Sequence, residues 1–130
     1  MHMPRILLHL DDDHRQTDLL RLMLRNQEYT VISANDAAKA LELMRQQRPD
    51  IALVDINMPR INGVEFAAQV KGMPEYRDIP LIALTANAMY GDREYYLANH
   101  FDGYLAKPIL RLELVRALEA ALTKPPLTPP

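Results

Sequence analysis

Short apolar segments alternate along this chain with longer segments whose apolar residues follow helical spacing. Apolar runs of four or five residues suit buried strands, whereas stripes with a spacing of three or four suit amphipathic helices. The alternation therefore predicts a βα repeat, with five strands and five helices. The predicted strands are Ile6–Leu10, Thr30–Ala34, Ile51–Val54, Leu81–Leu84 and Tyr104–Ala106.

Each predicted helix follows one of these strands. Asp13 is suited to cap the first helix, and Asn35 or Asp36 the second, since short polar side chains accept bonds from the first backbone N–H groups. The fourth helix, within Tyr90–Asn99, has a weaker pattern because its apolar residues are adjacent. The other stripes are Leu19, Leu20, Met23, Leu24; Ala37, Leu41, Met44; Phe66, Ala67, Val70; and Val115, Leu118, Leu122.

Apolar strands that alternate with helices predict an α/β fold. Such strands form a parallel sheet with both faces covered, and right-handed crossovers make the sheet doubly wound. Of the five strands, the second is followed by no comparable set of polar residues, which suits an outer position in the order 2-1-3-4-5. We therefore expect a flavodoxin-like architecture.

The composition narrows the class of protein. The 130 residues include no cysteine, which excludes disulfide scaffolds, cysteine zinc sites and thiol catalysis. A net charge of −2 argues against a protein built to bind nucleic acid, and no apolar run is long enough to span a membrane.

We expect one domain over residues 5–122, preceded by a lead at 1–4 that resembles a cloning remnant. Residues 123–130 form a proline-rich tail or linker stump.

Charged and hydroxyl side chains follow four of the five predicted strands. In a parallel sheet the carboxyl ends of the strands meet at one edge, where ligands bind. Taken singly, each residue has an ordinary explanation as a helix cap, a turn residue or a solvated side chain. Their combination favours a site in which carboxylates hold Mg²⁺ or Mn²⁺, and a lysine and a hydroxyl contact phosphoryl oxygens. The residues are Asp11, Asp12, Asp13, Asp55, Thr85 and Lys107.

These residues carry a resemblance over roughly Arg5 to Leu122. The chain resembles the receiver domain of two-component response regulators, the CheY-like superfamily. The motifs are Asp11-Asp12 after the first strand, Pro49–Pro59 around Asp55, Asn62-Gly63, Ala83–Ala86 and Gly103–Pro108. Each motif by itself is weak, and together they are highly specific.

The resemblance implies a role for each matching residue at the acidic end of the site. Asp55 would accept the phosphoryl group. Asp12 would bind the metal directly and Asp11 through water, while Asn57 would offer its backbone carbonyl. The run of three aspartates leaves its register open between Asp11-Asp12 and Asp12-Asp13, and the apolar stripe that begins at Leu19 favours the first pair.

The resemblance also implies a switch. Thr85 would bond a phosphoryl oxygen, Lys107 would pair with the phosphate, and the Lys107–Pro108 peptide would be cis. Tyr104 would be the aromatic switch residue beside the fourth and fifth strands. Phosphorylation would then alter the face made by the fourth helix, fifth strand and fifth helix, which a downstream effector reads.

We therefore expect a cytoplasmic phosphorelay receiver. Its donor would be a sensor histidine kinase or a histidine phosphotransfer protein. The chain would assist its own phosphorylation and dephosphorylation without being a conventional enzyme, and it would carry no output domain and bind no nucleic acid or membrane. The sequence is compatible with a stand-alone regulator and with a receiver from a hybrid kinase or larger regulator.

Two other classes of protein share some of these features. Phosphatases of the haloacid dehalogenase type also use a nucleophilic aspartate, but a second aspartate usually follows two residues later, where this chain has Asn57. A receiver that serves only as an interaction module usually lacks an acidic residue or the lysine, and this chain keeps both. Both alternatives are therefore less favoured.

One residue departs from the family pattern. His9 lies in the first predicted strand, where the family usually has an aliphatic side chain. We expect a core histidine with one hydrogen bond in preference to a functional one.

Overall fold

The computed structural model describes residues 3–58, 62–86, 89 and 91–123, in which five strands alternate with five helices as predicted. Of the expected lead at 1–4 and the expected tail at 123–130, residues 1–2 and 124–130 lie outside the described residues, and Thr123 is the last residue of the fifth helix. Each strand agrees with its predicted position to within one residue at either end. In chain order the elements are β1 (Arg5–Leu10), α1 (His14–Met23), β2 (Tyr29–Ala34), α2 (Ala37–Gln46), β3 (Ile51–Asp55), α3 (Gly63–Lys71), β4 (Leu81–Thr85), α4 (Asp92–Ala98), β5 (Gly103–Ala106) and α5 (Arg111–Thr123).

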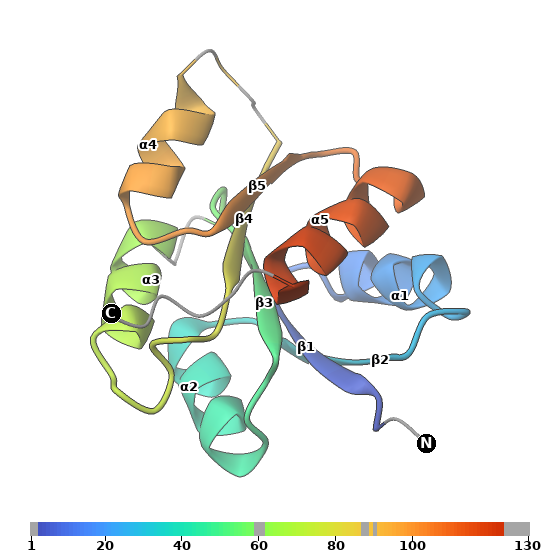
Figure 1. Ribbon diagram of the computed structural model, residues 1–130, viewed down its shortest axis with the longest axis horizontal. Coiled ribbons are helices and arrows are strands. Elements are labelled where there is room, and N and C mark those ends of the chain that lie inside the picture. The colour runs from blue at the N-terminus through green and yellow to red at the C-terminus, as the bar shows by residue number, and fades with distance from the viewer. Residues whose placement is uncertain (1–2, 59–61, 87–88, 90, 124–130) are drawn as a thin grey trace.

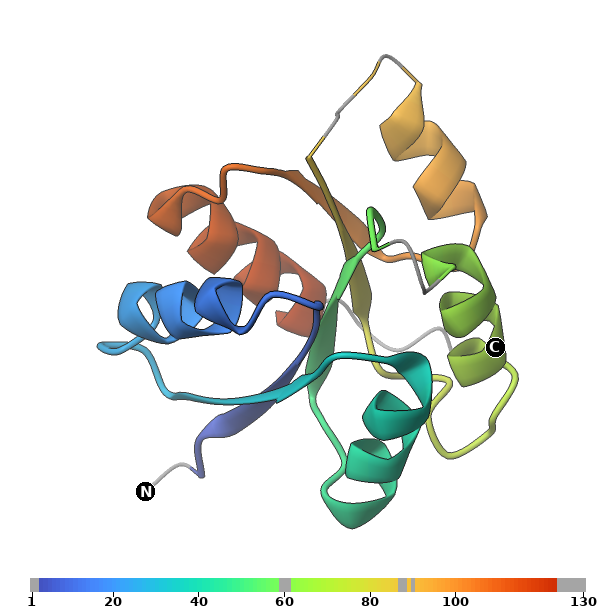
Figure 2. The same cartoon turned by 180° about the vertical axis from the view of Figure 1, so that it is seen from behind.

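The five strands form one parallel sheet in the order β2-β1-β3-β4-β5, which confirms the predicted topology. Figures 1 and 2 show the twisted sheet running through the middle of the molecule, with helices on both sides. The inner strands β3 and β4 are buried at every position, as expected where helices cover both faces.

Two apolar clusters fill the space on the two faces of the sheet. Because side chains alternate along a strand, Leu8 and Leu10 of β1 point to one face and Leu7 to the other. The first face packs against α2 and α3, and the second against α1 and α5 (Figure 1). His9 alternates with Leu8 and Leu10, and it therefore shares the second face with Leu7 and α1.

Polar caps begin the first three helices. Asp13 accepts from the N–H of Arg15, and Asp36 accepts from that of Lys39, which confirms Asp13 and chooses Asp36 over Asn35. Asn62 caps α3 in the same way. These bonds satisfy backbone donors that a helix start leaves unpaired.

The predicted apolar stripe of α1 is only partly correct. Leu20 and Leu24 are buried, but Leu19 is 42% exposed and Thr17 is 1% exposed. Residues 17, 20 and 24 share one helical face because they lie three or four positions apart, whereas residue 19 is turned about 100° away from residue 20. The hydroxyl of the buried Thr17 forms a hydrogen bond with His9, as described below.

Within the described part of the chain, no helix has both the length and the apolar character needed to cross a bilayer.

Candidate functional site

The register of the central strands brings the predicted polar residues to one edge of the sheet. Leu10 pairs with Val54, so Asp11 and Asp55 follow neighbouring positions at the carboxyl ends of β1 and β3. Thr85 ends β4 beside Ala106, the last residue of β5, and Lys107 comes next. Residues far apart in the sequence therefore meet because their strands are adjacent and parallel.

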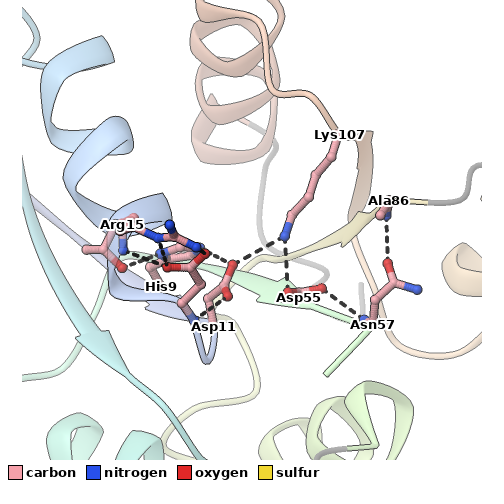
Figure 3. Close-up of polar contacts among 9 residues, drawn as sticks. His9, Asp11, Arg15, Asp55, Asn57, Ala86 and Lys107 are labelled. Carbon is pink, nitrogen blue, oxygen red and sulfur yellow. Dashed lines mark hydrogen bonds and ion pairs between the residues drawn. The ribbon is translucent and has the colours of Figure 1, made fainter. Parts of the chain in front are cut away.

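Lys107 connects the two buried carboxylates. Its Nζ lies 3.1 Å from Asp55 Oδ2 and 3.3 Å from Asp11 Oδ2. Figure 3 shows the lysine side chain reaching from the end of β5 to a point between them. Burial by itself would lower the pKa of Lys107, but the bond to Asp55 and the charge of Asp11 outweigh it and raise that pKa. The lysine is therefore held as a cation. The Lys107–Pro108 peptide is cis, as expected.

Asp11 is the most constrained carboxylate of the site. Its Oδ1 accepts from the N–H of Asp13 at 2.9 Å, and its Oδ2 lies 3.3 Å from both Lys107 Nζ and His9 Nε2. Burial would raise the pKa of Asp11, but the contact with His9, the Asp13 N–H and the Lys107 charge lower it to about 2. Asp11 is therefore ionised at neutral pH although it is 4% exposed.

The other two aspartates of the run differ in what they do. Asp13 caps α1 and also accepts from the Arg15 guanidinium, at 3.1 Å from both Nε and Nη2. Asp12 is exposed, and one of its carboxylate oxygens groups with oxygens of Asp11 and Asp55, all within 4.8 Å of one another. Since hard carboxylate oxygens suit Mg²⁺ or Mn²⁺, these three residues fit a divalent cation. The geometry favours the register Asp11-Asp12.

The structure places Asn57 beside Asp55 and against the next strand. The N–H of Asn57 donates to Asp55 Oδ1 at 2.9 Å, and its side-chain Oδ1 accepts from the N–H of Ala86 at 2.6 Å (Figure 3). Thr85 is 2% exposed and ends β4, the strand next to β3. It precedes Ala86, whose N–H is bound to Asn57 beside Asp55. The Asn57–Ala86 bond was not predicted, because it depends on the approach of two loops.

Tyr104 is the second residue of β5 and precedes Lys107 in the chain. It is not part of the acidic group formed by Asp11, Asp12 and Asp55. Its ring stacks on that of Tyr96 from α4, with centroids 5.9 Å apart and an angle of 16° between planes. Its buried hydroxyl has no hydrogen-bond partner among the residues that the structure describes. Burial, followed by the charge of Asp92, raises the pKa of Tyr104. The phenol therefore stays neutral and links β5 to α4.

The expectation of a core histidine with one hydrogen bond was incomplete. His9 is buried, and one hydrogen bond joins its Nδ1 and Thr17 Oγ1 at 2.8 Å, as expected. It also contacts Asp11 through Nε2, which was not expected. Strand alternation carried the missing signal, because residues two apart in a strand lie on the same face.

The pKa of Asp11 predicts a pH dependence of stability in metal-free buffer. A carboxyl whose pKa falls from 3.8 to about 2 on folding stabilises the fold above the higher value and loses that effect as pH falls through the lower one. Between about pH 6 and pH 3 we expect a loss of about 1 kcal/mol in the free energy of unfolding through this group. Urea denaturation followed by circular dichroism measures it. Asp11→Asn should lack this part of the slope, and parallel profiles for the two proteins would contradict the prediction.

Comparison with known proteins identifies the family. The model of the response regulator receiver domain matches residues 7–119. The response regulator DivK of Brucella anthropi is 32% identical over 120 residues, which cover 92% of this chain and 98% of that protein.

Solved structures agree with this match. The receiver domain of the sensor histidine kinase PA1611 of Pseudomonas aeruginosa, solved with a magnesium ion coordinated in its active-site cleft, superimposes with a TM-score of 0.81 at 33% identity. That match covers 93% of this chain and 99% of the other. The chemotaxis response regulator CheY4 of Vibrio cholerae gives a TM-score of 0.82 at 27% identity, covering 92% and 99%. The order of the strands, the acidic edge and these matches agree, and the chain belongs to the response regulator receiver domain family of two-component signal transduction.

Proposed function

We propose that this receiver accepts a phosphoryl group on Asp55 from a phosphohistidine donor, with the help of a divalent cation. The observation that carries the proposal is the setting of Asp55. Asp55 is 5% exposed, and its carboxylate lies in the oxygen group with Asp11 and Asp12 and has Lys107 Nζ at 3.1 Å. A nucleophile, a cation site and a fixed positive charge thus meet within one small volume.

The transfer would proceed by attack of an Asp55 carboxylate oxygen on phosphorus. The P–O bond forms as the P–N bond of phosphohistidine breaks, and the electron pair returns to the donor imidazole. Phosphoryl transfer requires in-line positioning and neutralisation of the charge on the equatorial oxygens. Lys107 supplies positive charge on one side of Asp55, and the Thr85 hydroxyl would donate to a phosphoryl oxygen from the end of β4.

The acidic group would hold the cation. Asp12, exposed at the edge of the site, and Asp55 would be direct ligands, together with the Asn57 backbone carbonyl. Asp11 would act through water because its Oδ1 already accepts from the Asp13 N–H and its Oδ2 from Lys107, with His9 Nε2 also 3.3 Å from Oδ2. When bound, Mg²⁺ would offset the negative charge of the carboxylates and of the incoming phosphoryl group.

Incubation of the chain with Mg²⁺ and acetyl phosphate, followed by intact mass spectrometry, tests this function. We expect one phosphoryl adduct, which should not form when excess chelator is present from the start because the reaction needs the divalent cation. Receiver domains are signalling domains and not conventional enzymes, so the phosphoryl group should remain on the chain itself. An unmodified mass under these conditions would contradict the proposal.

The proposed partners are those with which receiver domains act, namely histidine kinases and effectors. We propose a sensor histidine kinase or histidine phosphotransfer protein as the donor. We propose the face of α4, β5 and α5 as the surface that an effector reads. Tyr95 and Leu97 of α4 and Leu112 of α5, all at least 40% exposed, support a protein contact there. We also propose residues 5–122 as the extent of the domain, since β1 begins at Arg5 and the family match ends within α5.

Substitutions of Thr85 and Tyr104 should separate phosphorylation from its propagation. We expect Thr85→Ala to accept phosphate on Asp55 more slowly, by at most about 100-fold, because one donor to the phosphoryl group is lost. Tyr104→Ala should leave the reaction nearly intact and alter effector affinity. The reason is that the Tyr104 ring stacks on Tyr96 of α4 and is not part of the carboxylate group that holds Asp55. Amide chemical shifts of residues 91–122, with and without beryllofluoride, measure the propagation.

In the wild-type chain these shifts should extend to α4 and α5, and both substitutions should reduce them. A ligand shifts a two-state equilibrium only by its different affinity for the two states, so new bonds to the phosphoryl mimic must exist in one state only. Shifts confined to residues around Asp55 in the wild type would mean that the chain relays or stores phosphate without switching this face.

A further inference from the structure

His9 is a polar side chain in a position that the fold would otherwise fill with an apolar one. It is 0% exposed on β1, on the sheet face that also carries Leu7 and packs against α1. A buried imidazole is costly unless both ring nitrogens have partners, because the transfer of polar groups from water into the core is unfavourable. The contacts of its two nitrogens therefore indicate why the residue is accommodated there.

The two contacts assign the roles of donor and acceptor. Nε2 lies 3.3 Å from Asp11 Oδ2, at ion-pair distance but without the alignment of a full hydrogen bond, and Nδ1 lies 2.8 Å from Thr17 Oγ1. An ionised carboxylate only accepts, so we assign the tautomer whose proton lies on Nε2, facing Asp11. In that tautomer Nδ1 accepts from the Thr17 hydroxyl. The contacts thus define a directed chain from α1 through β1 to Asp11.

The order of threonine, histidine and aspartate is also that of a hydrolytic triad, but burial excludes this function. Thr17 is 1% exposed and His9 is 0% exposed, so a substrate cannot reach the hydroxyl. The chain continues instead on its other side. Asp11 Oδ2, which faces His9, also accepts from Lys107, and Lys107 contacts Asp55 (Figure 3).

We propose that His9 is a positioning residue, which holds the Asp11 carboxylate through the Thr17–His9–Asp11 chain and thereby sets the cation site and Lys107 relative to Asp55. This inference rests on the proposed function. His9 itself is too deeply buried to touch the cation or the phosphoryl group, and it acts through Asp11.

The shared oxygen explains why His9 matters. Asp11 Oδ2 lies at the same distance, 3.3 Å, from His9 Nε2 and from Lys107 Nζ. Without His9, the backbone N–H of Asp13 and Lys107 would be the remaining donors of this set, and the carboxylate could turn toward the lysine. Loss of a partner behind a direct metal ligand typically lowers metal affinity by roughly 10- to 100-fold, and His9 acts one step farther out because Asp11 would reach the cation through water. The poor alignment of the Nε2 contact favours the lower end.

Two pairs of variants test the proposal. His9→Val removes both contacts, whereas His9→Gln restores a donor toward Asp11. Thr17→Val removes the hydroxyl at nearly constant volume, and Thr17→Ser keeps it. Leu7→Val is the matched control, since Leu7 is equally buried on the same face of β1 and its apolar side chain can form no hydrogen bond or ion pair with the site.

Magnesium affinity, followed by amide shifts or calorimetry, is the first measurement. We expect His9→Val to weaken binding by about tenfold, His9→Gln to recover part of it, and Thr17→Val to fall between wild type and His9→Val. Thr17→Ser and Leu7→Val should bind like wild type. With acetyl phosphate, His9→Val should need more Mg²⁺ for half-maximal rate.

The second measurement uses metal-free protein. The ¹⁵N shifts of the His9 imidazole should show a protonated Nε2 and an unprotonated Nδ1, and Thr17→Val should change the Nδ1 shift while Leu7→Val does not. These readouts are independent of phosphorylation. A wild-type chain that takes up no phosphate, but loses Mg²⁺ affinity in His9→Val, would contradict the proposed function and support this inference.

Unchanged Mg²⁺ affinity in folded His9→Val would overturn the proposal and leave His9 as a core residue. Equal losses in His9→Val and Leu7→Val would also overturn it, because they would reflect stability alone. If His9→Val does not fold, the comparison of Thr17→Val with Thr17→Ser decides, and equal Mg²⁺ affinity in that pair overturns the proposal.

Discussion

Asp55→Asn should abolish phosphorylation by acetyl phosphate, with no phosphoryl adduct detectable in the intact mass at any Mg²⁺ concentration. The amide keeps the shape of the side chain but removes the charged oxygen that would attack phosphorus. It also removes the charge that holds Lys107 Nζ at 3.1 Å from Asp55 Oδ2. Asp55 is the last residue of β3, and β3 lies between β1, which Asp11 follows, and β4, which ends at Thr85. Of the three grouped carboxylates, that of Asp55 is therefore the central one.

Asp13→Asn is the matched control for this experiment. It makes the same change in charge close to the site, and asparagine keeps the capping ability that α1 needs. We expect this variant to form the adduct as the wild type does. A stable adduct in Asp55→Asn would contradict the assignment of Asp55, and its loss in both variants would point to an effect of local charge.

Asp12→Asn should weaken Mg²⁺ binding by at least about tenfold, since a direct ligand should matter no less than the residues behind it. Asp12 is exposed, belongs to the oxygen group with Asp11 and Asp55, and is not the helix cap. Asp13→Asn should change Mg²⁺ affinity little, because its carboxylate already binds the N–H and guanidinium of Arg15. Isothermal titration of the two variants and the wild type measures the difference.

The comparison between these neighbours also tests the register of the acidic run. Both variants lose one negative charge within a few residues of the site, so a general electrostatic effect would weaken binding in both. Equal losses would contradict the pair Asp11-Asp12, because both a general electrostatic effect and the register Asp12-Asp13 would produce them. Wild-type affinity in Asp12→Asn would remove Asp12 from the ligand set.

The sequence was most informative where the physics is local. The apolar strand segments and the capping chemistry of Asp13 depend on residues a few positions apart, and both agree with the structure. Helical spacing placed the helices but assigned Leu19 of α1 to the wrong face. The same is true of the site in outline. Because parallel strands bring their carboxyl ends to one edge, Asp11, Asp55 and Lys107 could be placed together before any distance was known.

The errors arose where a side chain's surroundings depend on another element. Leu19 was expected in the core with Leu20 and Leu24, but the buried face of α1 carries Thr17 beside Leu20 and Leu24, and Leu19 is exposed. Likewise, the bond from the N–H of Ala86 to Asn57 Oδ1 needs the loops after β3 and β4 to approach each other. No pattern within either segment contains that information.

The sequence by itself therefore determined the βα alternation and the residues at the edge of the sheet, because short-range periodicity and the rules of parallel sheets are sufficient for these. The pattern of polar residues was compatible with the strand order 2-1-3-4-5, and the pairing of the strands confirms that order. Only the tertiary structure decided which polar groups touch: Lys107 between Asp11 and Asp55, and His9 between Thr17 and Asp11. Such contacts depend on ångström-scale distances between separate elements, which follow from the packing of α1 and β5 against the central strands and not from the spacing of residues along the chain.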